Sequence, residues 1–191
     1  MADMNQYRLA VKDYASRNIN YLFHNKGDEH ALIILTNLFV NAKKHIRIAA
    51  NKLYNDEVVN TKEYIDSMRS FLDRNDTNLS ILITKKPSKE EIKSCPKENT
   101  FYWMLYNHPA YDQGRIIIKE GHGKSFHDKD GSQINFCTGD EQMYRLENAI
   151  VERKAIANFG DSDMTGILIR TFDSVFPNLT SIVELKDFYT E

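Results

Sequence analysis

The chain has 191 residues, of which 41% are hydrophobic and 27% charged, a balance typical of a globular domain with one buried core. No apolar run approaches the roughly 20 residues of a membrane-spanning helix, and the first residues lack the basic and apolar regions of a secretory signal. A net charge of −2 excludes a strongly basic protein, so nucleic-acid binding would require a local patch of positively charged side chains. We expect a single domain over residues 1–191 that is cytoplasmic and makes no contact with a membrane.

The first third of the chain predicts an extension, a helix and a strand. Residues 1–27 are interpreted as an N-terminal extension, in which the alternation over 19–23 is compatible with a short strand. A helix is predicted from Asp28, because apolar residues then recur every three or four positions. Residues 45–50 alternate between apolar and other side chains, which predicts a strand.

The middle of the chain predicts a crossover and an exposed connection. Asn60 is expected to cap a helix, because Glu63 follows three residues later and the pair can satisfy amide groups at a helix start. The apolar strand 79–84 then completes a strand, helix, strand unit of the right-handed parallel kind. Residues 85–100, rich in Lys, Glu, Pro and Ser, indicate an exposed connection, and the aromatic run 101–106 favours a helix in the core or at a protein interface.

The C-terminal half predicts a meander of short strands followed by a helix. Turn residues separate the predicted strands, which are Arg115 to Lys119, Gln133 to Cys137, Met143 to Glu147 and Lys154 to Phe159. Asp161 or Ser162 is expected to cap the last clear helix, which stops at Pro177. A tail strand over 181–185 is expected at the edge of the sheet. The fold class predicted is therefore α/β.

The order of these elements resembles the phospholipase D-like superfamily. The N-terminal match is a helix opening at Glu29 and a strand entered over 42–49, and the C-terminal match is the strands over 134–147 and 155–161 before a helix. The resemblance spans about His30 to Phe176, which is one half-domain of that family. It implies a mixed sheet flanked by helices.

Catalysts of that family use an HxKxxxxD motif supplied by two halves. One His attacks phosphorus, the other protonates the leaving group, and Lys holds phosphate oxygens. By the resemblance, Asn135 stands at the His position and Cys137 at the Lys position, while the carboxylate position falls on Gln142, two residues after Asp140. Because an Asn side chain cannot replace imidazole as a phosphorus nucleophile, the resemblance implies a degenerate and catalytically silent site.

Polar residues on the same strands form the predicted binding site. Arg145 and Glu147 are two positions apart, so they share one face of their strand. We expect them to line the cleft where this fold keeps its site, together with the other polar residues of the set. The predicted binding residues are Asn135, Asp140, Arg145, Glu147 and Asn158.

A second reading of the motif gives an alternative catalytic site. His122 and Lys124 form a literal HxK, and Gly131 begins a literal GSxxN, although the Asp position of the motif is occupied by Lys129. This alternative predicts a metal-independent phosphodiesterase or nuclease, with His122 and Lys124 as catalytic candidates and the site completed by dimerisation.

No metal site or cofactor is predicted. The nearest candidate ligands lie in one loop, but their spacing matches no zinc or calcium motif; they are His122, His127, Asp128 and Asp130.

The first functional hypothesis is a catalytically silent binding or accessory module. Because one half-domain of the family pairs with another, the resemblance implies a homodimer. It also implies a nucleic-acid or protein partner and a role in nucleic-acid processing or phage defence. A structural subunit that docks through Phe101 to Tyr106 is a third hypothesis.

Overall fold

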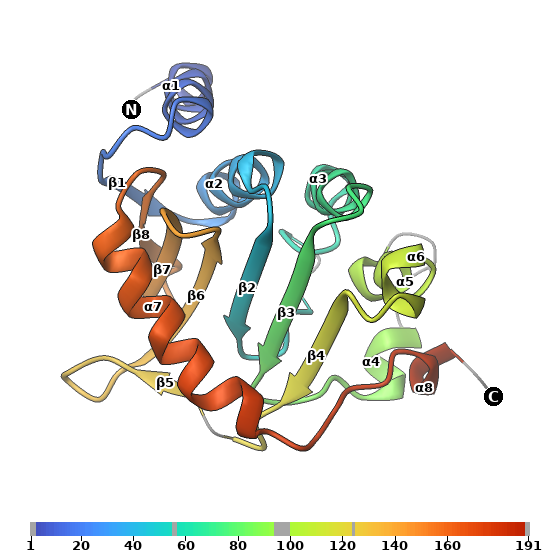
Figure 1. The fold of residues 1–191 in the computed structure, drawn as a ribbon. Helices are drawn as coiled ribbons and strands as arrows, with labels where there is room; N and C mark the ends of the chain where they lie inside the picture. The colour runs from blue at the N-terminus through green and yellow to red at the C-terminus, as the bar shows by residue number, and fades with distance from the viewer. Residues whose placement is uncertain (1–2, 55–56, 94–99, 124, 190–191) are drawn as a thin grey trace.

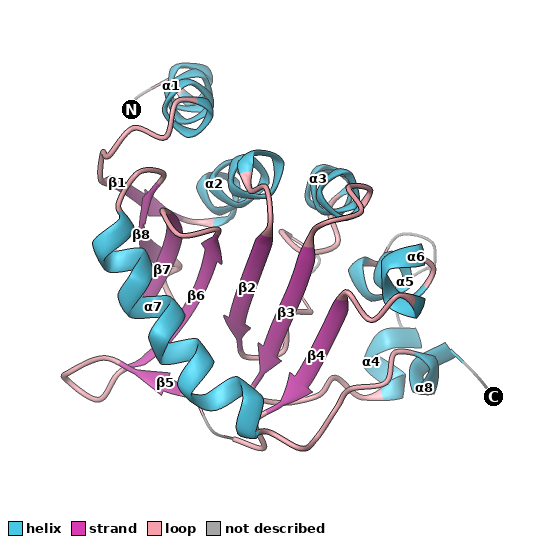
Figure 2. Cartoon of the chain, in the orientation of Figure 1, coloured by secondary structure: helices cyan, strands magenta, loops and turns pink. Residues whose placement is uncertain are grey.

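A computed structural model describes residues 3–54, 57–93, 100–123 and 125–189. The strands join in one eight-stranded mixed sheet of order β1-β8-β7-β6-β2-β3-β4, with β5 paired to β6. Helices cover both faces, as Figures 1 and 2 show, which confirms the predicted α/β class with a helix-flanked mixed sheet. The strands are β1 (Phe23–Lys26), β2 (His45–Ala50), β3 (Asn78–Ile83), β4 (Ile116–Glu120), β5 (Phe126–His127), β6 (Gln133–Gly139), β7 (Met143–Ala149) and β8 (Lys154–Asn158).

The helices divide between the two faces and one edge of the sheet. In Figure 1, α2 and α3 lie on one face, and α7 crosses the other. They are α1 (Met4–Ser16), α2 (Asp28–Asn41), α3 (Lys62–Leu72), α4 (Lys89–Lys93), α5 (Phe101–Tyr106), α6 (Pro109–Asp112), α7 (Ser162–Val175) and α8 (Lys186–Tyr189). Among the described residues, no helix combines the length and apolarity needed to cross a membrane.

The predicted crossover is present. β2 and β3 pair in parallel from His45 opposite Asn78 to Ala50 opposite Ile83, with α3 between them in the chain. The N-cap of α3 is one residue later than predicted, because the hydroxyl of Thr61 accepts the amide of Tyr64. Asn60 instead accepts the amide of Phe101 and so joins the start of α5 to the start of α3.

The predicted meander is wrong for its first strand. β4 pairs in parallel with β3 at one side of the sheet, and the chain then crosses back so that β6 pairs antiparallel with β2. Of the four predicted strands, the last three, β6, β7 and β8, form an antiparallel meander, to which the two-residue strand β5 adds through β6. The predicted tail strand is reduced to one bridge, Lys119 to Ile182, which covers the outer edge of β4. Local turn signals identified these strands but could not give their order, because that order depends on contacts between distant residues.

The first 27 residues contribute two elements. α1 is capped by Asp3, whose carboxylate accepts the amide of Asn5, and it buries Val11 and Ala15. β1 starts at Phe23, later than the predicted alternation, and pairs antiparallel with β8. The segment after β3 forms the short helix α4, and residues 94–99, including Cys95, lie outside the described residues.

Alternation along β6 and β7 separates two cores. Even-numbered residues of these strands, among them Phe136 and Tyr144, pack with Phe172 under α7. Odd-numbered residues face α2, where Cys137 and Met143 join the larger core. Because side chains alternate across a strand, every polar residue at an odd position of β6 or β7 is directed toward the α2 side.

Candidate functional site

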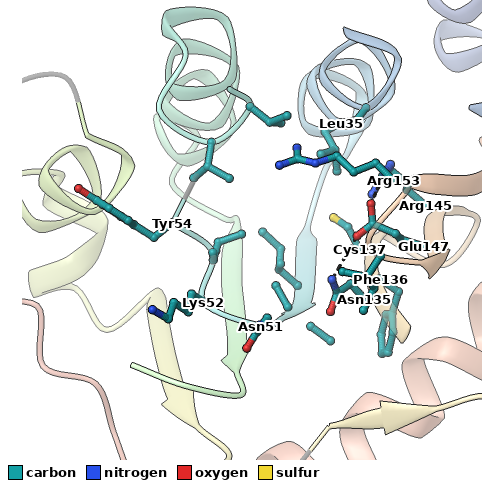
Figure 3. A pocket seen from close by; sticks show the side chains of 18 of the residues that line it. Leu35, Asn51, Lys52, Tyr54, Asn135, Phe136, Cys137, Arg145, Glu147 and Arg153 are labelled. Atoms are coloured by element: carbon teal, nitrogen blue, oxygen red, sulfur yellow. Dashed lines mark hydrogen bonds and ion pairs between the residues drawn. The ribbon is translucent and has the colours of Figure 1, made fainter. Parts of the chain in front are cut away.

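A cavity of about 320 Å³ opens on the α2 side of the sheet, at the carboxyl end of β2. Its floor is the start of β6 and the end of β7, and its walls come from α2, the segment after β2 and the β7–β8 hairpin (Figure 3). Open α/β sheets bind ligands in crevices outside the carboxyl ends of their parallel strands. The volume falls within the range of small-molecule sites.

Three predicted binding residues meet on the floor of this cavity. Arg145 donates from Nη2 to Glu147 Oε1 at 3.0 Å, and Asn135 donates from Nδ2 to Glu147 Oε2 at 3.1 Å (Figure 3). The sheet register explains this geometry, since Asn135 lies opposite Glu147 and Cys137 opposite Arg145. We call Asn135, Arg145 and Glu147 the polar floor.

The polar floor is almost closed to solvent. The side chains of Arg145 and Glu147 are 8% and 12% exposed, and Arg145 Nε has no hydrogen-bond partner among the described atoms. A buried ion pair is costly to desolvate, and an unpartnered donor adds to that cost. The floor therefore carries polar groups that the fold alone leaves incompletely satisfied.

The walls are mainly apolar and the rim is charged. Lys52 and Arg153 lie at the rim, and each pairs with carboxylates that are outside the cavity lining. Lys52 pairs with Glu91, and Arg153 pairs with Asp28 and with Glu57. The wall residues include Ala31, Leu35, Ile48, Leu53, Val58 and Val59.

The other two predicted binding residues lie elsewhere. Asp140, at the opposite end of β6, accepts the amides of Lys43, Lys44 and His45 at 2.7, 2.8 and 3.1 Å. Asn158, at the end of β8, accepts the amides of Tyr21 and Gly160 and donates to Asn20. Neither residue lines the cavity. Each holds one segment of backbone against another.

The alternative catalytic residues are remote from the polar floor. His122 lies in the β4–β5 connection with its side chain 68% exposed, and its Nδ1 is 3.7 Å from Glu120. Lys124 lies outside the described residues. Asp128 accepts the amides of Asp130 and Ser132, which is turn geometry. Within the described ranges, no group of three or more His, Cys, Asp or Glu is arranged to hold a metal ion.

The cavity contains one thiol and, among its described lining residues, no imidazole. Cys137 is 3% exposed, and burial raises the pKa of its thiol, with a smaller opposing effect from Arg145. A thiol that remains protonated and enclosed is a poor nucleophile. Neither residue at the family's motif positions, Asn135 or Cys137, therefore brings a ready nucleophile to the cavity.

Sequence reasoning missed the rim of the cavity. Lys52 and Tyr54 follow β2 in a segment without a recognisable motif, and Arg153 lies in the β7–β8 hairpin. The position of Lys52 directly after a parallel strand was a usable signal, because such positions gather at one edge of the sheet. No spacing in the sequence connects Arg153 with it.

No protein-family model matches the chain, and a search of curated proteins finds no match. Solved structures do match. TrmBL2, an archaeal chromatin protein with a novel mode of DNA binding, superposes with a TM-score of 0.56 at 13% identity over 94% of this chain and 63% of TrmBL2. This chain thus spans less than two thirds of that protein.

Two further solved structures superpose on the chain with similar scores. Nuc from Salmonella typhimurium, a phospholipase D family member, has a TM-score of 0.55 at 10% identity over 87% of this chain and 99% of Nuc. Phosphatidylserine synthase from Haemophilus influenzae has a TM-score of 0.54 at 12% identity over 96% of this chain and 47% of the synthase. The chain has a phospholipase D-like fold, which confirms the resemblance seen in the sequence.

Proposed function

We propose that this chain is a catalytically silent phospholipase D-like module that works by binding a ligand in the cavity above the polar floor. The observation that carries the proposal is the position of Glu147. Its buried carboxylate accepts hydrogen bonds from Arg145 and Asn135 on the strands where the family's motif would stand. Because Glu147 already pairs with Arg145, a phosphodiester, which the catalysts of the family must bind, would have to displace that carboxylate to reach the guanidinium.

The accessory role that we propose is in nucleic-acid processing or phage defence, with a homodimer as the working form. Its support is the family resemblance and the structural similarity to a DNA-binding chromatin protein. A local positive patch would be needed for direct contact with nucleic acid, since the net charge is −2.

The test measures cleavage of nucleic acid, binding of nucleic acid and the oligomeric state of the chain. The full chain is incubated with single- and double-stranded DNA and RNA in EDTA, and the same nucleic acids are used in filter binding at two salt concentrations. We expect no cleavage. Cleavage abolished by His122→Ala would overturn the proposal and favour the alternative phosphodiesterase. Sedimentation at micromolar concentration gives the oligomeric state, and a monomer that binds neither nucleic acid nor protein would exclude the accessory role.

A further inference from the structure

The charged residues of the cavity are all paired. Arg145 has Glu147 at 3.0 Å, Lys52 has Glu91, and Arg153 has Asp28 as well as Glu57 at 3.5 Å. Each cation is therefore already matched by at least one carboxylate. A ligand with a net negative charge would have to compete with these carboxylates for the cations.

The polar floor still has unused hydrogen-bonding capacity. A carboxylate can accept about four hydrogen bonds, and the structure gives each oxygen of Glu147 one side-chain partner. The amide oxygen of Asn135 is a further acceptor. Arg145 is 7% exposed, and its buried Nε donates to no described atom. The floor can therefore accept hydrogen bonds from a ligand at Glu147 and Asn135, and the second N–H of the Asn135 amide, which lines the cavity, can donate one.

The apolar walls restrict the ligand further. Leu35, Ile48 and Val58 are among the side chains around the floor, and Tyr54 lies at the rim. Such walls favour a compact ligand that has apolar surface of its own, because burial of apolar surface is favourable for both the ligand and the walls. A hydrated inorganic ion offers no such surface.

The geometry points to an uncharged small molecule that both donates and accepts hydrogen bonds, such as a nucleoside or a sugar, with its donors directed at Glu147. This inference rests on the proposed binding function and adds the class of ligand. It also implies discrimination against phosphorylated forms of the same molecule, because Arg145 and Glu147 already neutralise each other and the rim cations are already paired, so a phosphate would lose its hydration without gaining an unpaired cation.

Matched pairs of ligands test the inference. Calorimetric titration compares nucleosides and simple sugars with their own monophosphates on the full chain. We expect at least one neutral compound to bind at least tenfold more tightly than its own monophosphate. Comparison of the nucleoside series with the sugar series shows which of the two classes of compound binds. Equal or tighter binding of the monophosphates, or no binding of any neutral compound at millimolar concentration, would overturn the inference.

Variants locate the binding on the polar floor. Glu147→Gln keeps the side-chain volume but removes the charge. It should lower the affinity for the neutral ligand about tenfold and reduce the discrimination against the monophosphate. Glu141→Gln is the matched control, because Glu141 is exposed on the β6–β7 turn and outside the cavity lining. Asn135→Ala provides a second variant should Glu147→Gln fail to fold. Unchanged affinity in a folded floor variant would contradict the assignment.

The outcomes separate this inference from the proposed function. Binding of monophosphates alone, without cleavage, would be consistent with a silent binding module but would contradict the inference of a neutral ligand. Cleavage of nucleic acid would remove the silent module itself. Binding of a neutral ligand that survives both floor variants would keep the binding function and move it away from the floor.

Discussion

The β6–β7 hairpin carries a carboxylate at each end, and the two differ in their partners. Asp140, at the turn, accepts three backbone amides, whereas Glu147, at the open end, accepts two side chains. Backbone amides are fixed by the fold, so Asp140 and its partners Lys43, Lys44 and His45 form a structural unit that we call the capped end. Side-chain partners can rearrange, which suits the polar floor to binding.

Solvent exposure sharpens the contrast. Glu147 and Arg145 are nearly closed to water, whereas Asp140 is only half-buried. Removal of one partner of a buried ion pair leaves the other charge buried without a partner. Single substitutions in the polar floor should therefore lower the stability of the fold strongly. The capped end loses hydrogen bonds when it is mutated, but no charge is left deep in the protein.

The largest effect is expected at the polar floor. Glu147→Ala should lower the free energy of unfolding by about 3 kcal/mol, because it leaves Arg145 buried without its carboxylate. The double variant Arg145→Met with Glu147→Leu should recover most of that loss, since apolar side chains of similar size need no partner. Urea unfolding of the single and double variants measures both values. A double variant as unstable as the single one would show that the unpaired charge is not the cause.

A smaller loss is expected at the capped end. Asp140→Ala should cost about 2 kcal/mol, since three amides lose a charged acceptor. Asp140→Asn should cost less, because Asn keeps an acceptor and tolerates the positive φ of 50° at this position. Urea unfolding gives the stabilities, and titration with the neutral ligand should give an unchanged affinity for both folded variants. Loss of affinity in Asp140→Asn would place this residue in the binding site after all.

The same comparison shows what the sequence could predict. The polar floor follows from strand alternation, a local property, so Arg145 and Glu147 were placed on one face without knowledge of the fold. Asp140 caps amides that lie 97, 96 and 95 positions earlier in the chain, and no local pattern indicates such partners. Asp140 was grouped with the floor because it is close in sequence, although the length of β6 separates them.

The fold shows the same division. The β2–α3–β3 crossover is local and was predicted, whereas the position of β4 beside β3 and the return of β6 to β2 were not. The rim cations Lys52 and Arg153 line the same cavity only because of that long-range order. α1 is not among the predicted helices, although its core-facing residues recur every three or four positions and the signal is therefore in the sequence; they are Met4, Tyr7, Val11, Tyr14 and Ala15.

The capped end should also make stability depend on pH. Burial, with a smaller contribution from Arg47, lowers the pKa of His45 from 6.5 to about 4. Between pH 6.5 and 4 the unfolded chain therefore binds a proton that the folded chain does not, so stability falls as pH falls through this window. His45→Gln should flatten this part of the pH profile in urea unfolding. His127→Gln is the control, since His127 is exposed. An unchanged slope in His45→Gln would contradict the prediction.

The smallest effect tests whether the polar floor opens independently of the capped end. Cys137 lies beside the floor, is 3% exposed, and has a thiol pKa raised by burial, so iodoacetamide at pH 8 should leave it unmodified in the folded chain. Mass spectrometry of peptides separates Cys137 from Cys95. We expect the slow modification of Cys137 to follow global unfolding as urea increases. Modification faster than global unfolding would mean that the floor opens locally. The two ends of the hairpin would then differ in stability as well as in the partners of their carboxylates.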